Sequence, residues 1–275
     1  MTRPWLADDG ALVRLRLVGG SLAPAALGRL VTAAGEFGDG NVYLTKRANV
    51  QLRGIPHRDG RLPEGLLTRV RDAGLLPSET HELVRNVMVS PLTGRVGGRT
   101  DLRPVAVALD RLLLAEPSCA GLPGRFLFVL DDGRGDLVDR ASDLAAVALD
   151  ARTVQVRAGR DQWGPAVAVD EVADALLSLT MRFLAARGEG TTAAWHVDEL
   201  DAPLLGCARD TRTRVTCGRP SYGRHRQVDG REAEHVPVPD GNLTPELAER
   251  VLARAGDEVV VTPWRSLLLP DLEAS

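Results

Sequence analysis

The chain has 275 residues, of which 44% are apolar and 26% are charged, and its formal net charge is −3. This length predicts two compact lobes, and the charge gives no general attraction to nucleic acid. No apolar run approaches the roughly 20 residues that span a bilayer, and residues 1–10 lack an apolar signal core. We therefore expect a cytoplasmic protein with no nucleic-acid or membrane partner.

The first 77 residues predict a strand, a helix, two further strands and a second helix. Apolar side chains alternate with Arg14 and Arg16 in the first strand, which is typical of a strand with one solvated face. Pro24 suits the first turn of the following helix, and Gly35 ends its apolar pattern. The expected elements are a strand at 11–17, a helix at 24–34, strands at 42–44 and 50–55, and a helix at 63–73.

Beyond a boundary near Pro77, the sequence predicts a second lobe of mixed structure that ends near Leu200. Between Pro203 and His235 the periodic pattern is lost, and arginines alternate with Gly, Ser, Thr and Pro. This composition indicates a mobile linker or a long loop. The elements expected in the second lobe are helices at 105–114 and 169–186 and strands at 126–130 and 153–157.

The residues that follow this linker repeat the pattern of the first unit. Gly20, Leu22, Pro24 and Leu30 align with Gly241, Leu243, Pro245 and Val251. After a contraction of the second copy, Leu44 and Thr45 align with Val261 and Thr262, whereas the next basic residue is shifted by one position, Arg47 against Arg265. The alternative is that two strand–helix–strand units built from Leu, Val and Ala align by chance.

Three segments together resemble the nitrite/sulfite reductase superfamily. They are LTKRANVQLRGI at 44–55, RNVMVSPLTG at 85–94 and LPGRFLFVLDDG at 122–133. Within the superfamily, RANVQLRG, the SPL that follows Arg-Asn, FVLDDG and the late TPWRSLLLP resemble the precorrin-3B synthases of cobalamin biosynthesis. The resemblance covers essentially the whole chain except the arginine-rich linker.

The resemblance implies an α+β fold in which two ferredoxin-like half-domains form a pseudo-two-fold assembly and each is followed by an α/β lobe. The internal repeat is what such a fold would leave in the sequence. We accordingly assign 1–77 to the first ferredoxin-like half, 78–202 to an α/β lobe that binds a tetrapyrrole or anion, 203–235 to the linker, and 236–275 to the second half, whose following lobe is absent.

The resemblance also implies three basic ligand contacts. The basic residue of the threonine–arginine turn is Arg47, and the arginine of the Arg-Asn pair is Arg85. A further basic position after Leu-Pro is Arg125, but the second cationic position that reductases carry there is Leu127. Arginine suits this role because its planar fork binds a carboxylate through two parallel charge-assisted bonds. The missing cation puts reduction of sulfite or nitrite in doubt.

Several polar residues of the same motifs have two possible roles. Asn49, Gln51 and Arg53 alternate along one strand, so they either contact the ligand or form a solvated strand face. Asn86 contacts the ligand or bonds backbone in a turn. The pair at 131–132 precedes a glycine, which favours a hairpin turn over paired catalytic carboxylates. The five histidines have no metal-ligand spacing, so no metal site is predicted from them.

The family's redox centre is a 4Fe-4S cluster held by four thiolates in the second α/β lobe. This chain has three cysteines, Cys119, Cys207 and Cys217, and all precede the second half. The family therefore implies an iron–sulfur cluster and a tetrapyrrole, but this chain lacks the cysteines for the cluster. Either the sequence is a truncated form of a longer protein, with an apolar surface that favours self-association or a protein partner, or it is a natural short relative.

The leading functional hypothesis is a precorrin-3B synthase-like oxidoreductase, whose complete relatives hydroxylate a precorrin macrocycle with dioxygen. The alternative from another class is a redox-inactive module that binds a tetrapyrrole, or a subunit that completes its active site with another chain. A protein like the sulfite and nitrite reductases is the third hypothesis. We expect a precorrin-like small molecule as the ligand in the first two cases.

Overall fold

The computed structural model describes residues 4–8 and 10–274 of the chain. Residues 1–3 and 9 of the predicted first half and residue 275 of the predicted second half lie outside the described residues. The chain divides into two compact units. Unit 1 comprises residues 1–82 and 220–275, and unit 2 comprises residues 83–219.

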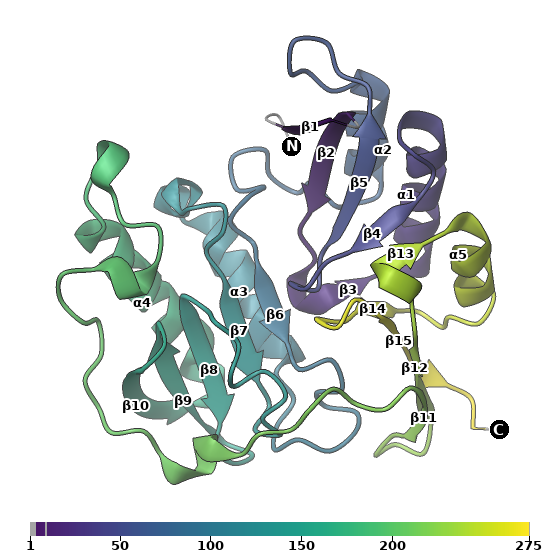
Figure 1. The fold of residues 1–275 in the computed structure, drawn as a ribbon. Coiled ribbons are helices and arrows are strands. Elements are labelled where there is room, and N and C mark those ends of the chain that lie inside the picture. The colour runs from purple at the N-terminus through teal and green to yellow at the C-terminus, as the bar shows by residue number, and fades with distance from the viewer. Residues whose placement is uncertain (1–3, 9, 275) are drawn as a thin grey trace. The chain divides into compact units, whose positions relative to one another are not determined.

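Unit 1 contains two copies of one sequence of elements (Figure 1). The first copy consists of β1 (Trp5–Ala7), β2 (Gly10–Leu15), β3 (Ser21–Leu22), α1 (Pro24–Phe37), β4 (Val42–Leu44) and β5 (Val50–Ile55), followed by α2 (Glu64–Asp72). The second copy consists of β11 (Gly223–Arg226), β12 (Glu232–Val236), β13 (Asn242–Leu243), α5 (Pro245–Leu252), β14 (Val259–Val261) and β15 (Leu267–Leu272). We call these copies the first and second halves.

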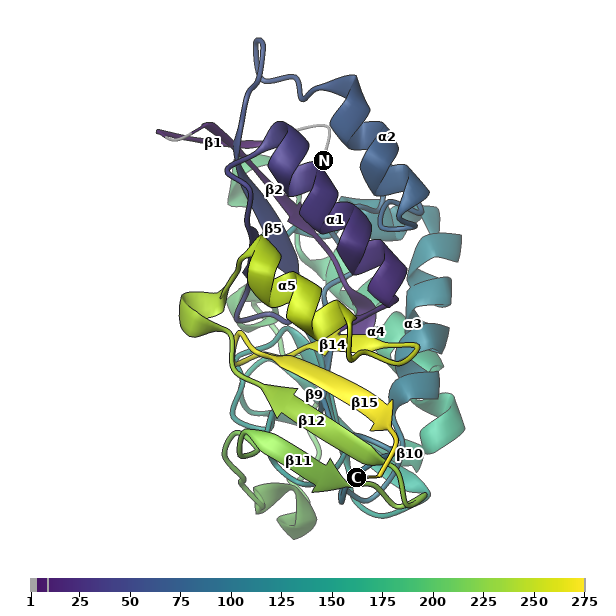
Figure 2. The same cartoon turned by 90° about the vertical axis from the view of Figure 1, so that its right-hand side faces the viewer.

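The two halves of unit 1 exchange a short strand. One sheet has the order β1-β2-β5-β4-β13, and the other has the order β11-β12-β15-β14-β3. The strand β3 of the first half thus extends the sheet of the second half, and β13 extends the sheet of the first. The helices α1 and α5 lie side by side and share one apolar core with both sheets (Figure 2). The α+β fold with two ferredoxin-like halves is therefore confirmed.

The repeat extends to irregular details of the backbone. The pairing of β2 with β5 shifts register between Ala11 and Val13, and the pairing of β12 with β15 shifts between Glu232 and Glu234. Positive φ angles recur at equivalent positions in both halves: Gly19 and Asp240, Gly20 and Gly241, Ala48 and Arg265, and Gly54 and Asp271. Chance alignment of two generic units would not reproduce bulges and left-handed residues together.

The structure explains the one-position shift of the basic residue in the repeat. The N–H groups of Arg47 and Trp264 both donate to the threonine hydroxyl two residues earlier, at 3.3 Å. Trp264 therefore occupies the place of Arg47, and Arg265 occupies the place of Ala48, where both residues have positive φ. The basic residue of the first turn has no counterpart in the second.

The linker predicted over residues 203–235 is wrong in its second part, where the chain forms strands. It contains β11 and β12, and β12 pairs with β15 within the second sheet. Its arginines looked like solvated linker residues, but several bond acidic side chains: Arg212 donates to Asp150 at 2.9 Å, and Arg224 pairs with Glu232 across β11 and β12. The second half accordingly begins before residue 236.

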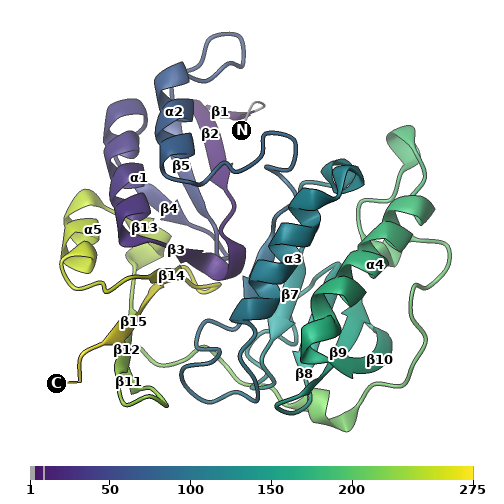
Figure 3. The ribbon, with the colours of Figure 1, turned by 180° about the vertical axis from the view of Figure 1, so that it is seen from behind.

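Unit 2 is a five-stranded sheet with two helices on one face (Figure 3). Its elements are β6 (Val87–Val89), α3 (Arg103–Ala115), β7 (Phe128–Asp131), β8 (Leu144–Ala148), β9 (Thr153–Ala158), β10 (Gln162–Ala168) and α4 (Val172–Ala186). The strands β6, β7 and β8 are parallel, and every residue in them is buried, as expected for a sheet covered on both faces.

The hairpin predicted at residues 131–133 is absent, because β7 and β8 run parallel and cannot be joined by a tight turn. The chain instead returns to the start of β8 through a loop over residues 132–143. Among the described residues, no helix combines the length and apolar character needed to cross a membrane.

Candidate functional site

The predicted site residues fall into two groups, one in each unit. Unit 1 holds Arg47, Asn49, Gln51 and Arg53, which lie on the β4–β5 turn and along β5. Unit 2 holds the other three, Arg85, Asn86 and Arg125, which lie just before β6 and β7. The parallel arrangement of β6 and β7 brings their amino-terminal ends to one edge of the sheet.

A cluster of guanidinium groups forms on the first sheet of unit 1. Arg14 lies on β2, Arg16 follows that strand, and Arg47 lies in the β4–β5 turn. Burial, followed by the positive charges of Arg14 and Arg47, lowers the pKa of Arg16 to about 10. Like charges that disfavour the protonated form must lie close to one another. We call these three residues the basic cluster.

Polar side chains continue this surface across the first sheet. Residues opposite one another in the sheet share a face, and Arg14 is paired with Gln51, Gln51 with Tyr43, and Tyr43 with Asn242. The guanidinium carbon of Arg53 lies 5.6 Å from the centre of the Tyr43 ring. Gln51 and Arg53 thus share one half-buried polar face, as their alternation predicted.

Asn49 differs from its neighbours on β5. It is buried, and its Oδ1 accepts a hydrogen bond from the N–H of Leu17 at 2.8 Å. This contact joins the β4–β5 turn to the end of β2. The side-chain oxygen of Asn49 therefore stabilises the turn that carries Arg47.

Arg85 forms a buried ion pair within unit 2. Its Nε and Nη2 donate to the two carboxylate oxygens of Asp110 on α3, at 2.5 and 2.9 Å. The side chains of Arg85 and Asp110 are 10% and 16% exposed. One side of the guanidinium fork is therefore occupied, and an anionic ligand could reach Arg85 only through Nη1 or by displacing Asp110.

The other two predicted residues of unit 2 differ in exposure. The Nδ2 of Asn86 donates to the carbonyl oxygens of Leu83, Gly124 and Phe126 at 3.1–3.3 Å, and the residue is fully buried. Asn86 therefore binds backbone rather than presenting its amide group to a ligand. Arg125 is exposed, whereas Leu127, at the second position where the reductases carry a lysine, is buried.

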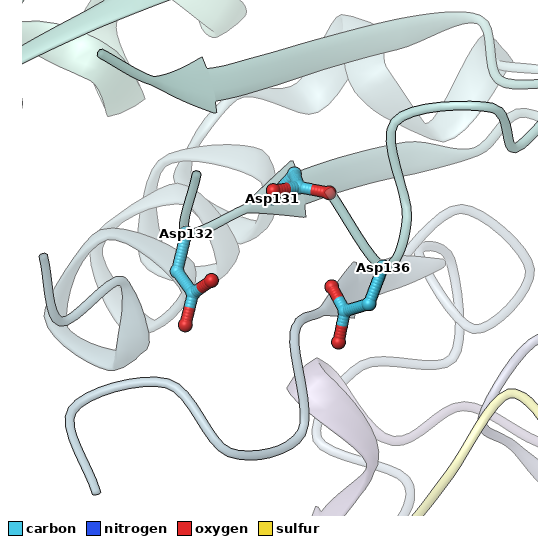
Figure 4. A group of neighbouring side chains, drawn as sticks. All are labelled: Asp131, Asp132 and Asp136. Carbon is cyan, nitrogen blue, oxygen red and sulfur yellow. The ribbon is translucent and has the colours of Figure 1, made fainter. Parts of the chain in front are cut away.

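Three aspartates gather where β7 ends, and Figure 4 shows their carboxylates around one space. Asp131, Asp132 and Asp136 each offer an oxygen within 4.8 Å of the others, and all three are buried. Asp131 accepts backbone N–H groups of the loop, and Asp132 is bonded by Arg134. Because these oxygens already have donors and a guanidinium lies among them, the cluster organises the loop.

Asp136 has fewer hydrogen-bond donors around its carboxylate than Asp131 or Asp132 has. Its Oδ1 accepts from the hydroxyl of Ser90 at 2.6 Å, but its buried Oδ2 has no hydrogen-bond partner. Burial, followed by the charge of Asp131, raises the pKa of Asp136 from its ordinary value of 3.8 to about 7. The folded protein therefore favours the protonated carboxyl group.

This raised pKa predicts a pH-dependent stability. Asp136 contributes stability that is complete below the unfolded-state pKa of 3.8 and is lost as the pH rises through about 7. We expect Asp136→Asn, which stays neutral, to lose less of its Tm between about pH 5 and pH 8 than the wild-type protein does. Thermal unfolding by circular dichroism across this range measures the difference. The exposed neighbour Asp139→Asn should keep the wild-type slope; equal slopes for all three proteins would contradict the assignment.

The cysteines do not fit an iron–sulfur cluster. Burial raises the pKa of the Cys119 thiol to about 11, whereas Cys207 and Cys217 are exposed. Within residues 4–8 and 10–274, the aspartate cluster is the one group of three or more His, Cys, Asp or Glu side chains that is close enough to hold a metal. A cluster of the family type takes four thiolates, and the whole sequence has three.

Comparison with known proteins agrees with the geometry of unit 1. Residues 6–59 match the family model of the nitrite/sulfite reductase ferredoxin-like half domain. A precorrin-3B synthase of Sinorhizobium sp. is 31% identical over 134 residues, which are 48% of this chain and 28% of that protein. The NirA protein of Mycobacterium tuberculosis superimposes with a TM-score of 0.72 over 98% of this chain, at 21% identity.

These likenesses support the nitrite/sulfite reductase superfamily, and residues 6–59 carry its ferredoxin-like half domain. The half-domain match covers β1 to β5, which carry the basic cluster and Gln51. The superposition shows that the NirA fold extends over unit 2 as well. This chain covers 56% of the NirA chain.

Arg14 and Arg16 could not be recognised as candidate site residues from the sequence, because a strand with alternating arginines is also typical of a solvated face. The signal that could have identified them is their alternation with apolar residues, which places both side chains on one face. Arg14 lies near the end of β2 and Arg16 just beyond it, and the residues 11–13, 15 and 17 around them are buried.

Proposed function

We propose that this chain binds a tetrapyrrole carrying several carboxylates, as a precorrin-3B synthase-like protein of cobalamin biosynthesis. The observation that carries the proposal is the basic cluster: Arg14 and Arg47 lie close enough to Arg16 to lower its pKa. A ligand with several carboxylates would be attracted by this charge, because an arginine fork binds a carboxylate through two parallel bonds. Gln51 and Arg53 supply further donors on the same face.

The likeness to the precorrin-3B synthase supports this ligand class over the small oxyanions. Reduction of sulfite or nitrite needs concentrated positive charge around a small anion. Position 127, where the resemblance expects a cation, is instead a buried leucine. A sulfite or nitrite reductase is therefore the less favoured function.

A second function is a redox-inactive tetrapyrrole-binding module, or a subunit that obtains its redox centre from another chain. The observation that favours it is the cysteine set, because a 4Fe-4S cluster takes four thiolates and the sequence has three. In complete precorrin-3B synthases the redox centre would support hydroxylation of the macrocycle by dioxygen. The residues of this chain would bind and orient the macrocycle in both cases.

Tetrapyrrole binding can be tested by absorption titration with uroporphyrin, which carries carboxylates on all its peripheral arms. We expect saturable binding, weakened about 10–100-fold in Arg47→Ala and in Arg14→Ala, since each substitution removes charge-assisted hydrogen bonds. Arg250→Ala on α5 is the matched control, because Arg250 is an exposed arginine of the same unit. Circular dichroism would check that each variant is folded.

The outcomes separate the functions. Absence of binding, or equal weakening in Arg250→Ala, would refute the tetrapyrrole proposal. Binding by a protein that lacks iron and acid-labile sulfide after anaerobic purification would favour the redox-inactive module. Stoichiometric iron and sulfide would instead show that a cluster is held, and would favour the oxidoreductase.

A further inference from the structure

A second group of arginines lines a cavity inside unit 2. The cavity has a volume of about 510 Å³ and lies among the loop before β8, the turn between β9 and β10, and residues near 196–198 and 209. A volume of this order suits a small-molecule ligand. Its lining carries four guanidinium groups, those of Arg140, Arg157, Arg160 and Arg209, against three carboxylates. The cavity is therefore cationic even when its histidine is neutral.

One of the four guanidinium groups is buried, whereas the three carboxylates of the lining are exposed. Arg157 is only 6% exposed. The three carboxylates of the lining belong to Asp139, Asp161 and Asp198, which are all exposed residues. Water screens the exposed carboxylates but not the buried guanidinium. The interior of the cavity therefore attracts anions more strongly than the simple charge balance indicates.

Arg157 is held in place by neutral acceptors only. Its Nη1 donates to the carbonyl oxygen of Val138 at 2.7 Å, and its Nη2 donates to the carbonyl of Arg140 and the hydroxyl of Ser142. Its Nε is buried without a hydrogen-bond partner. Burial and then the charge of Arg209 lower the pKa of Arg157, whereas the charges of Asp139, Asp161 and Asp131 act against this shift. The fold thus fixes a buried cation without a directly bonded carboxylate.

Arg209 is oriented beside Arg157 by an aromatic ring. Its guanidinium carbon lies 4.8 Å from the centre of the Trp163 ring, and that of Arg157 lies 5.7 Å from the same ring. The Nε and Nη2 of Arg209 donate to Thr213 at 2.9 and 2.8 Å. The Trp163 ring therefore lies beside both guanidinium groups before a ligand binds, so little conformational freedom would be lost when an anion binds.

Arg140 and Arg160 are the other two arginines that line the cavity. In the described part of unit 2, neither guanidinium forms a hydrogen bond or an ion pair with another side chain, so both are available to a ligand. Arg140 is half-buried and Arg160 is exposed at the mouth. The cavity therefore combines two fixed cations with two adaptable ones.

We propose that this cavity binds a small multivalent oxyanion, a phosphate or a compound with two or more carboxylates. The buried guanidinium of Arg85 is paired with the carboxylate of Asp110, which is the usual compensation for a buried charge. Arg157 has no such partner within hydrogen-bond reach in residues 83–219 as described. An anion supplies the missing charge, and arginine forks match its oxygen atoms. The site is independent of the tetrapyrrole proposed above.

Titration of the full-length protein with inorganic phosphate and, separately, with citrate tests the site. We expect saturable binding of at least one of the two, with a change in Trp163 fluorescence because Arg209 lies against that ring. The change should disappear in Trp163→Phe. Arg140→Gln and Arg160→Gln should each weaken binding about tenfold or more, as expected for the loss of a charge-assisted hydrogen bond. These positions avoid the structural bonds of Arg157.

Arg182→Gln is the matched control, because Arg182 is an exposed arginine on α4 outside the cavity. It should bind like the wild-type protein. Preference for phosphate or for citrate would decide between the two sources of oxyanion. Three results would overturn the proposal: neither anion binds, sodium chloride at equal ionic strength gives the same response, or Arg182→Gln loses as much affinity as the two cavity variants.

Discussion

Replacing Gly20 with alanine is expected to destabilise unit 1 by about 2–5 kcal/mol, because the new methyl group is both strained and obstructed. Gly20 has a φ of +75°, which alanine rarely adopts, and an added Cβ would lie 2.1 Å from the carbonyl oxygen of Val261. That oxygen belongs to β14, whose neighbour β3 begins one residue after Gly20. The substitution would therefore push the exchanged strand away from its sheet.

Urea denaturation of the full chain measures this effect, and two glycines provide comparisons. Gly241 is the equivalent residue of the second half, and its added Cβ would meet the carbonyl oxygen of Leu44 at 3.0 Å, so Gly241→Ala should be milder. Gly35 lies in α1 with no atom within 4 Å of an added Cβ. Gly35→Ala should stabilise by about 0.5–1 kcal/mol. A Gly20→Ala protein as stable as Gly35→Ala would contradict the close approach of the halves.

The repeat could be predicted from the sequence because its strongest signals are local. Pro24 and Pro245 both occupy the first turn of a helix, and Gly20 and Gly241 both have positive φ angles. These requirements of the backbone limit the residue type, so they remain visible after side chains on the surface have diverged. The ferredoxin-like halves of the predicted fold rest on these positions.

The strand exchange could not be predicted in the same way. The exchanged strands β3 and β13 have two residues each, and their partners β14 and β4 lie more than 190 residues away along the chain. A pair of residues carries no alternation from which a strand could be inferred. The same limitation explains the false linker, since β11 and β12 are recognisable only from their pairing with each other and with β15.

The candidate site was predicted in part, because the sequence names residue types but not their partners. It identified Gln51 and Arg53 as neighbours on one strand face, which alternation alone determines. It could not indicate that Asp110, 25 positions along the chain, bonds Arg85, or that Asn86 bonds three carbonyls. Nor could it find the cavity of unit 2, whose four arginines come from three separate segments.

The buried pair of Arg85 and Asp110 gives the second large expected effect. Asp110→Ala would leave the Arg85 guanidinium buried without its carboxylate, which we expect to lower the free energy of unfolding by about 3–5 kcal/mol. The comparison is Glu36→Ala, which removes the equally bidentate but exposed partner of Arg69 and should cost less than about 1 kcal/mol. Urea denaturation measures both values.

A double variant determines whether Arg85 also serves a ligand. Arg85→Met combined with Asp110→Leu replaces the pair by apolar groups of similar size, and such a change is often nearly neutral for stability. If the double variant is stable and still binds uroporphyrin as the wild-type protein does, Arg85 is a structural residue, and the basic cluster of unit 1 alone accounts for the carboxylate contacts. If it is stable but binding falls about tenfold or more, Arg85 contacts the ligand through Nη1 as well. An Asp110→Ala protein as stable as Glu36→Ala would instead show that Arg85 does not depend on Asp110.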